Sequence, residues 1–527
     1  MADYRHGVYG SEEATPISSM QNVTDGITIS IGVSPVHLAV NPAETNTPVL
    51  CYQKSEAVQQ LGYSEDFKTY TNCESMKLLF DTFGVSPVVF VNVFDPAKHK
   101  TDVTENVTLA NGVATLAAPI LIDSLVVKGK QSTVIEIQDG DGPVDDEIDD
   151  DFDVDDDLDS GTTTETVVAP TVTTETRIVD VLLVKDEDYI IATDDEGNVT
   201  VTVTATNKVS DGKIYLTYSQ PDPSKVTKED IIGKVDPATG RCSGIKLTSE
   251  VYARYGILSG IIIAPGWSKD PEVAAALASE AENMDEVFLA VAPVDLDTTQ
   301  IEGYTGAPAW KNQNGYSSKF QVSCYPMVKL GDRLYHGSTY LAGLLNRLDS
   351  QNDGIPFNSP SNKAISISGM YNADGTENYF GRKAANYLNG NGIVTFLNFN
   401  GWKMWGNRTS NYPQSSDPKD NFISVRRMFN YVNNRLIINF WSQIDEPTNR
   451  RLIDDVINKA NTWFNGLVSR GALLGGRCEF LESDNTQTDL MDGKIRFRVS
   501  YTPVSPAREI HFISQYDPDY LSNLFVS

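Results

Sequence analysis

The clearest alternation of apolar and polar positions lies near the C-terminal end of the chain. In residues 494–501 every second side chain is apolar, which is the period of a half-buried β-strand. Pro503 and Pro506 follow, and the chain then continues into a second short strand predicted over 508–513. A strand set off by two prolines has no obvious partner within its own fold. The pattern therefore predicts that residues 508–513 pair with another copy of the chain.

Two long helices are predicted before these strands, over 422–441 and 448–470. The second is amphipathic, and Gly471 is well placed to end it. Arginines along both helices either form a basic face for an acidic partner surface or are solvated helix flanks: Arg426, Arg427, Arg435, Arg450, Arg451 and Arg470. Arg450 and Arg451 lie in a first helical turn, where the helix dipole disfavours cations, and this favours a partner role.

The pattern changes twice along the rest of the chain. Residues 26–33 and 85–94 are predicted strands on either side of a helix at 74–83, and strand, helix and strand recur over 260–294. This order implies parallel crossovers. Residues 97–250 are instead rich in Val, Thr and Asp, with short alternating runs separated by turns, which is typical of an inserted all-β module.

These patterns predict an α/β (α+β) multidomain body with an inserted all-β domain and extended N- and C-terminal arms. The expected parts are an N-terminal arm (1–25), an α/β domain (26–96 plus 251–345), an inserted acidic β-rich peripheral domain (97–250), a C-terminal α/β core domain (346–502) and a C-terminal arm (503–527).

Charge is distributed unevenly along the chain. The net charge is −29, and residues 101–250 alone hold 32 acidic and 11 basic side chains, whereas residues 401–500 hold 11 acidic and 14 basic ones. So acidic a chain is a poor binder of nucleic acid, because phosphate contacts need Lys and Arg. The polar start of the chain has no secretion signal, and the longest apolar run, 257–265, is too short for a membrane span. We expect neither nucleic-acid binding nor direct membrane insertion.

The densest acidic segment, residues 139–159, has thirteen acidic residues and no basic one. Asp151, Asp153 and Asp155 alternate as in a calcium-binding EF-hand loop, but the loop glycine and the closing glutamate are missing. A solvated, self-repelling surface loop is favoured. The sequence leaves calcium binding open.

Candidate catalytic chemistry is sparse. Residues 264–269 stand between a strand and a helix but lack the glycines and the Gly-Lys-Ser/Thr ending of a phosphate loop. The five histidines are scattered, and the five cysteines show no metal-ligand spacing. We therefore predict no catalytic residue, no cofactor and no metal site, and we do not expect an enzyme.

Several short motifs occur in a recognisable order along the chain. They are His6-Gly7-Val8-Tyr9, residues 262–268, residues 324–328, residues 360–363, Trp405-Gly406-Asn407-Arg408-Thr409, residues 425–427, residues 445–449, residues 471–473 and residues 503–507. In this order they resemble the contractile tail sheath proteins of phages and of related contractile injection particles. The resemblance covers residues 250–515 well and 1–95 more weakly. Residues 97–250 match nothing in it, and Pro447-Thr448-Asn449 replaces a more compact Pro-Asn of many relatives.

The resemblance implies a structural subunit that forms stacked hexameric rings around an inner tail tube and contracts to drive the tube through the target cell envelope. It implies these partners: other copies of the chain, the tube protein, and baseplate and tail terminator proteins. The location would be a virion or phage-like particle assembled in the host bacterial cytoplasm. The expected subunit-interface arms hold Tyr4, Gly7, Val8, Tyr9, Arg508, Ile510 and Phe512, and the expected tube-facing residues are Arg450, Arg451, Asp454 and Asp455.

Two other function classes stay open at this point. One is a non-contractile surface or adhesion protein built around the acidic β module, and the other is an α/β enzyme whose site is not detected. Whether the particle is a virion or a phage-derived injection machine is also open.

Overall fold

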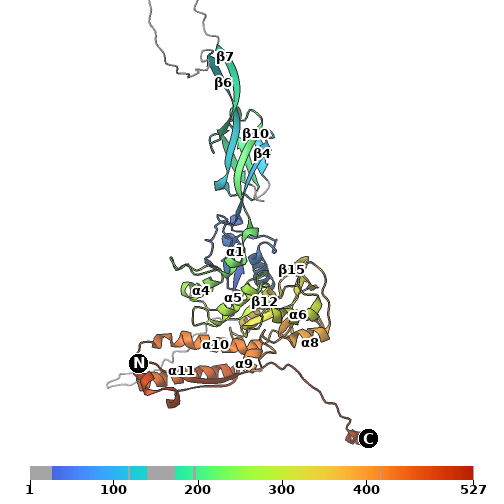
Figure 1. Cartoon of the computed structure of the whole chain (residues 1–527). Coiled ribbons are helices and arrows are strands. Elements are labelled where there is room, and N and C mark those ends of the chain that lie inside the picture. The colour runs from blue at the N-terminus through green and yellow to red at the C-terminus, as the bar shows by residue number, and fades with distance from the viewer. Residues whose placement is uncertain (1–25, 117–118, 139–171, 194–197, 416, 526–527) are drawn as a thin grey trace, which may run out of the picture. The chain divides into compact units, whose positions relative to one another are not determined.

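The computed structural model describes residues 26–116, 119–138, 172–193, 198–415 and 417–525. Two compact units divide the chain: the body, Met1–Asp95 with Val226–Ser527, and the insert, Pro96–Lys225 (Figure 1). Each unit has its own hydrophobic core.

The first sheet of the body has the strand order β11-β1-β3-β2. Strand β1 (Ile27–Gly32) pairs in parallel with β3 (Val88–Asn92) and β11 (Ser259–Ile263), and β2 (Pro48–Cys51) pairs antiparallel with β3. Every residue of β1 and β3 is buried. Strand β3 supplies the continuous apolar run expected of a parallel strand covered on both faces. Strand β1 alternates isoleucines with Thr28 and Ser30, whose buried hydroxyls bond to Asn346 and Ser75.

The second sheet of the body has the order β12-β13-β18-β19-β16. Its strands are β12 (Ala292–Asp295), β13 (Gln321–Cys324), β16 (Lys363–Ala364), β18 (Ile393–Asn398) and β19 (Trp402–Trp405). A smaller sheet holds β14 (Met327–Leu330), β15 (Arg333–Tyr335) and β17 (Gly369–Tyr371). The helices of this part are α1 (Lys54–Leu61), α2 (Thr71–Met76), α3 (Lys228–Ile232), α4 (Thr248–Tyr255), α5 (Pro271–Glu282), α6 (Gly303–Gln313), α7 (Gly337–Ser350) and α8 (Arg382–Asn389).

The expected domain boundary at 345/346 falls inside α7, and the two compact units do not separate at this position. Twelve of the residues of α7 are buried in the body. The second sheet joins β13, before this boundary, to β18, after it, through a parallel pairing. A helix buried on nearly all sides cannot end a domain in its middle, so the residues on both sides form one α/β core.

A C-terminal layer follows in the body, with α9 (Pro418–Asn421), α10 (Ile423–Phe440), α11 (Arg450–Ser469), β20 (Leu473–Glu479), α12 (Gln487–Met491) and β21 (Arg498–Pro503). Its apolar residues form a separate cluster that includes Met428, Phe464 and Cys478. The two long helices lie close to their predicted ranges. Strand β21 begins four residues after the predicted start at 494, because the backbone of Arg496 is bound by the Asn485 side chain at both N–H (2.8 Å) and C=O (2.9 Å).

The insert is an all-β unit of two sheets, β4-β10-β6-β7 and β5-β9-β8. Its strands are β4 (Lys100–Thr108), β5 (Val113–Leu116), β6 (Val126–Gln138), β7 (Val172–Leu182), β8 (Tyr189–Thr193), β9 (Val199–Val203) and β10 (Lys213–Pro221). The insert ends at Lys225 and not at 250. Residues 226–255 belong to the body because Ile231, Leu247 and Val251 are buried in its core.

The multidomain α/β fold class with an inserted all-β unit is confirmed. In the described ranges, no helix is long and apolar enough to cross a membrane.

Candidate functional site

The C-terminal layer is built on the amphipathic helix α11. Its buried residues are spaced three, four, four and three positions apart, which places them on one face: Ile453, Val456, Ala460, Phe464 and Leu467. The Asn449 side chain caps the helix by accepting the N–H of Leu452 at 3.0 Å. Gly471, with φ of 75°, follows its end as predicted.

Strands β20 and β21 form an antiparallel pair that packs on this helix. A Cβ atom at Gly476 would lie 2.9 Å from the Phe464 ring, so only glycine allows the strand to approach so closely. The Asn461 side chain binds both the N–H and the C=O of Cys478, at 2.7 and 3.1 Å. Tyr501 stacks on Phe464 with 5.8 Å between ring centroids. These contacts fix the sheet on the helix.

This sheet has open edges. Within the part of the chain that the structure describes, β20 and β21 pair only with each other, so each strand presents one unpaired edge. Unpaired edges can accept a further strand, and an isolated two-stranded sheet gains stability when one is added.

An apolar groove of about 700 Å³ lies beside the sheet. Side chains from α10, α11 and the segment leading into β21 line it, among them Leu436, Phe440, Val456, Ile495 and Phe497. The groove could hold the apolar side chains of an added segment.

The C-terminal arm, residues 504–525, leaves the body directly after β21 (Figure 1). Its described residues 508–513 pair with no strand of their own chain, and residues 507–524 are all exposed. Ile510, Phe512 and Ile513 are 71%, 92% and 95% exposed. Arg508 forms an ion pair with its neighbour Glu509 at 3.2 Å. Because exposed residues of this size are costly in water, the arm has the composition of a segment that is covered in an assembly.

Of the expected interface residues, Tyr4, Gly7, Val8 and Tyr9 lie outside the described residues. The expected tube-facing residues are at the start of α11, away from its buried face. Arg450 pairs with Asp454 at 3.0 Å, one helical turn later. Arg451 and Asp455 are exposed. With two arginines and two aspartates, this surface carries equal numbers of positive and negative charges.

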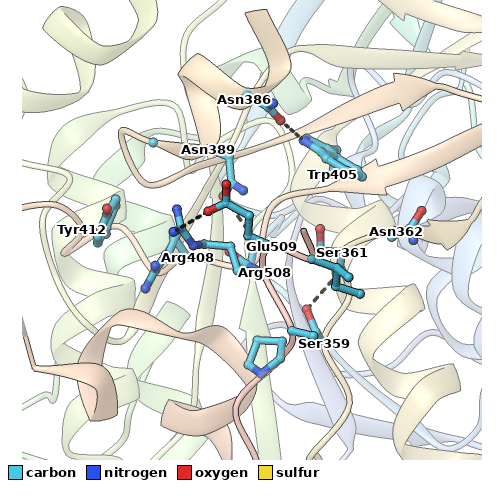
Figure 2. Close-up of a pocket in the computed structure, with 15 residues that line it drawn as sticks. Ser359, Ser361, Asn362, Asn386, Asn389, Trp405, Arg408, Tyr412, Arg508 and Glu509 are labelled. Atoms are coloured by element: carbon cyan, nitrogen blue, oxygen red, sulfur yellow. Dashed lines mark hydrogen bonds and ion pairs between the residues drawn. The ribbon is translucent and has the colours of Figure 1, made fainter. Parts of the chain in front are cut away.

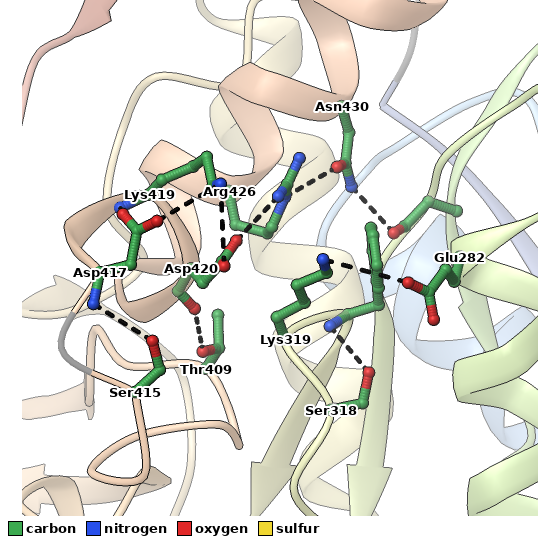
Figure 3. Close-up of polar contacts among 12 residues, drawn as sticks. Glu282, Ser318, Lys319, Thr409, Ser415, Asp417, Lys419, Asp420, Arg426 and Asn430 are labelled. Atoms are coloured by element: carbon green, nitrogen blue, oxygen red, sulfur yellow. Dashed lines mark hydrogen bonds and ion pairs between the residues drawn. The ribbon is translucent and has the colours of Figure 1, made fainter.

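For Arg426, Arg427 and Arg435 both alternatives, a basic face for a partner and solvated helix flanks, are wrong. All three are buried. Arg426 bonds to Asp420 at 2.9 Å and to Asn430 at 3.0 Å (Figure 3). Arg427 forms a bidentate pair with Asp349 of α7, with one distance of 2.9 Å. Arg427 therefore anchors α10 to the α/β core. Its partner is 78 positions away in sequence, so helical periodicity could not reveal it.

Polar groups elsewhere in the core are used for structure. His336 Nδ1 lies 2.7 Å from the carboxylate of Glu74, whose second oxygen accepts the His336 N–H. Ser268 and Ser338 both donate to Asp295. Burial raises the pKa of the Cys324 thiol well above its usual value. The described residues contain no group of three or more His, Cys, Asp or Glu side chains that could hold a metal ion.

Comparison with known proteins points to one family. Residues 415–515 match the family model described as the phage tail sheath C-terminal domain. The chain is 27% identical, over 99% of both chains, to the tail sheath protein of Burkholderia phage BcepMu. It is 24% identical to the tail sheath protein of Escherichia phage P2, over 57% of this chain and 74% of that protein.

One solved structure shares the fold over nearly the whole chain. The helical sheath protein of the anti-feeding prophage, in the contracted state, aligns over 97% of this chain and 99% of that chain, with a TM-score of 0.54 and 13% identity. The family match at 415–515 covers α10, α11, the open sheet and the first part of the arm, which are the parts of the candidate site.

Proposed function

Since residues 415–515 belong to the phage tail sheath C-terminal domain family and the whole chain is a relative of phage tail sheath proteins, we propose that this tail sheath subunit forms stacked hexameric rings around an inner tail tube. Contraction of the sheath would drive the tube through the target cell envelope. The family consists of structural proteins, and its phage members support a place for the chain in a virion or phage-like particle.

The observation that carries the proposal is the combination of an open two-stranded sheet and an exposed apolar arm on one layer. An arm that adds to the sheet of a neighbour makes a head-to-tail contact, and such contacts build open helical polymers when they do not close on themselves. Main-chain hydrogen bonds between added strands persist while the joined subunits rotate as rigid bodies. The apolar groove beside β21 would take Phe512 or Ile513 of the incoming arm.

The N-terminal arm, with Tyr4, Gly7, Val8 and Tyr9, would augment a neighbouring sheet in the same way. The insert would be a peripheral decoration, and Arg450, Arg451, Asp454 and Asp455 would face the tube. Further partners would be the tube protein, the baseplate and the tail terminator, with assembly in the host bacterial cytoplasm. The extended sheath would be metastable, so contraction would need no nucleotide.

Truncation of the C-terminal arm tests this function. Removing residues 507–527 should leave a folded monomer, because the described residues of this segment, 507–525, belong to none of the buried core clusters. Electron microscopy of the full chain should show wide, striated hollow tubes, and the truncated chain should form none. Sheath-like tubes from the truncated chain would refute the role of the arm. A full chain that forms no polymer under any assembly condition would remove the proposed function itself.

A further inference from the structure

A second groove of the body lies beneath the root of the C-terminal arm. It measures about 600 Å³ and is bounded on one side by residues 506–510 of the arm (Figure 2). The opposite wall is rich in amide and hydroxyl side chains: Ser359, Ser361, Asn362, Asn386, Asn389 and Asn407. Amide side chains can donate to and accept from peptide groups, so this wall suits an extended chain segment. We call it the arm-root groove.

Hydrogen bonds to neighbouring elements hold the loop that lines the groove in place. Lys311, which is completely buried, donates to the C=O of Ser410 at 2.6 Å. The Ser410 hydroxyl also lies 2.7 Å from the Ser323 hydroxyl in β13. On the other side, Trp405 Nε1 donates to Asn386 at 2.9 Å. A wall fixed in this way offers its polar groups to a ligand at little entropic cost.

Arg408 projects from this wall without an acidic partner. Its guanidinium stands between two aromatic rings, 4.3 Å from the centroid of Tyr412 and 4.0 Å from that of Phe422. Among the residues that the structure describes, no carboxylate forms an ion pair with it. Burial lowers the pKa of Arg408; Tyr412 opposes this shift, and the nearby charge of Arg508 adds to it. The positive charge is therefore stacked in place but not neutralised.

The arm brings a carboxylate into the same groove. Glu509 lines the groove and has only local contacts, with Arg508 at 3.2 Å and His511 at 2.8 Å. Exposed ion pairs between near neighbours contribute little stability and exchange easily. The groove also contains Asn407, which is 6% exposed and whose Oδ1 has no hydrogen-bond partner in the described chain. A backbone N–H of a seated arm would satisfy this oxygen.

We propose that residues 506–510 seat in the arm-root groove of their own chain, with Glu509 pairing with Arg408. This contact is made within one subunit and fixes the direction in which the arm leaves the body. It rests on the proposed function of the arm in assembly, because a fixed exit direction matters only if the tip reaches a neighbour. When one subunit rearranges, it would then pull on the arm at this contact. No loose segment of chain would have to be extended first.

Hydrogen exchange of the full-length chain, followed by mass spectrometry before polymerisation, tests the seating. Arg408→Gln and Glu509→Gln should each make the amides of residues 507–510 exchange about threefold faster, the size expected for one partly exposed ion pair. The double variant should exchange no faster than either single variant. The charge swap Arg408→Glu with Glu509→Arg should restore slow exchange. Asp517→Arg, farther along the same arm, is the control and should leave residues 507–510 unchanged.

The outcomes are separable from those of the truncation experiment. Unchanged exchange in both single variants, or failure of the swap to restore protection, would overturn the proposal even if the arm is essential for polymerisation. Exchange in β18 shows whether an Arg408 variant is folded. If it is not, Glu509→Gln decides, because its side chain is exposed.

Discussion

The buried ion pair between Arg427 and Asp349 is the residue-scale contact that joins the C-terminal layer to the α/β core. Burial raises the pKa of Asp349, although the charge and hydrogen bonds of Arg427 oppose this shift. A Cβ atom at Gly26 would lie 2.9 Å from the Asp349 side chain, so the pair also packs against the start of β1. One pair therefore fixes three segments that are distant in sequence.

Arg427→Ala should lower the free energy of unfolding by about 3–5 kcal/mol, because it leaves a buried carboxylate without its partner. Urea denaturation of the unpolymerised chain measures this. Arg427→Met combined with Asp349→Leu should recover most of the loss, since both charges are then removed. Arg477→Ala, at an exposed position, is the control and should change stability by less than about 0.5 kcal/mol. A small effect of Arg427→Ala would show that the pair is not a structural anchor.

The His336–Glu74 pair should make stability depend on pH. Burial disfavours the charged imidazole, but the charge and hydrogen bond of Glu74 outweigh it and raise the pKa of His336 from 6.5 to about 9. A base whose pKa is raised on folding stabilises the fold fully below its unfolded value of 6.5, and this contribution is lost as the pH rises through about 9. Burial lowers the pKa of Lys311 to about 8, which acts in the opposite direction between pH 8 and 10.5.

Comparison with His336→Gln isolates the histidine contribution, since Lys311 is present in both chains. The stability advantage of the wild-type chain over the variant should be largest at pH 6 and should shrink toward pH 9.5. Urea denaturation at several pH values gives this difference. An advantage that is constant with pH would mean that His336 is not charged in the folded chain.

At the start of α11, the double reversal of Arg450 and Arg451 to Glu tests the proposed tube-facing surface. It should weaken assembly on tubes more than tube-free polymerisation, because only the former would bring a partner against these side chains. Co-sedimentation with and without tubes measures both. Reversal of Lys68 and Arg241, which are also exposed, is matched in charge and should not distinguish the two assays. Equal losses in both assays would remove the tube-facing assignment.

Single-residue features were predictable from sequence where they are local. Gly471 at the end of the second long helix follows from the local pattern, and the structure has it just after the end of α11, with φ of 75°. The burial of Arg426, Arg427 and Arg435 was not predictable, because it depends on partners in other elements. From sequence alone a basic residue on a helix is predicted to be solvated, because the carboxylate that it contacts in the fold is not known.

At the scale of elements, the alternating pattern at 494–501 predicts a strand correctly but places its start four residues too early. The alternation that begins at 494 is real, but the first residues bond to Asn485 and to the α12 region and not to β20. Among the residues that the structure describes, the predicted strand at 508–513 has no partner. Periodicity reports which faces are apolar, and the pairing of the strand depends on where a partner edge is available.

Gly476 tests how tightly β20 must approach α11. Gly476→Ala should destabilise the chain by about 1–3 kcal/mol, because the added methyl group overlaps the Phe464 ring and pushes the sheet outward. Gly475→Ala is the matched control in the same strand, since nothing lies within 4 Å of its added Cβ. Thermal unfolding and polymerisation should both distinguish the two variants. Equal behaviour would mean that the sheet shifts freely on the helix.

At the scale of the whole molecule, the body and the insert have separate cores. The body cluster contains no residue between 95 and 225, and the insert cluster contains only residues of the insert. Residues 96–225 carry 28 acidic and 9 basic side chains, so they account for most of the net charge of −29. Most of the acidity of the chain therefore belongs to a unit whose hydrophobic core is separate from that of the body.

Replacing residues 96–225 with a short flexible linker should give a folded body that still polymerises, because the open sheet and the arm remain. The net charge becomes less negative, changing from −29 to −10. Repulsion between neighbouring subunits should therefore decrease, and polymerisation should need less salt. Light scattering over a range of salt concentrations measures this. Substituting the acidic residues of 139–159 with Asn and Gln separates the two causes, since it removes charge but keeps the insert. An unchanged salt dependence in both variants would show that the insert lies too far from its neighbours to repel them, whereas a change in the deletion alone would show that the insert acts by its bulk.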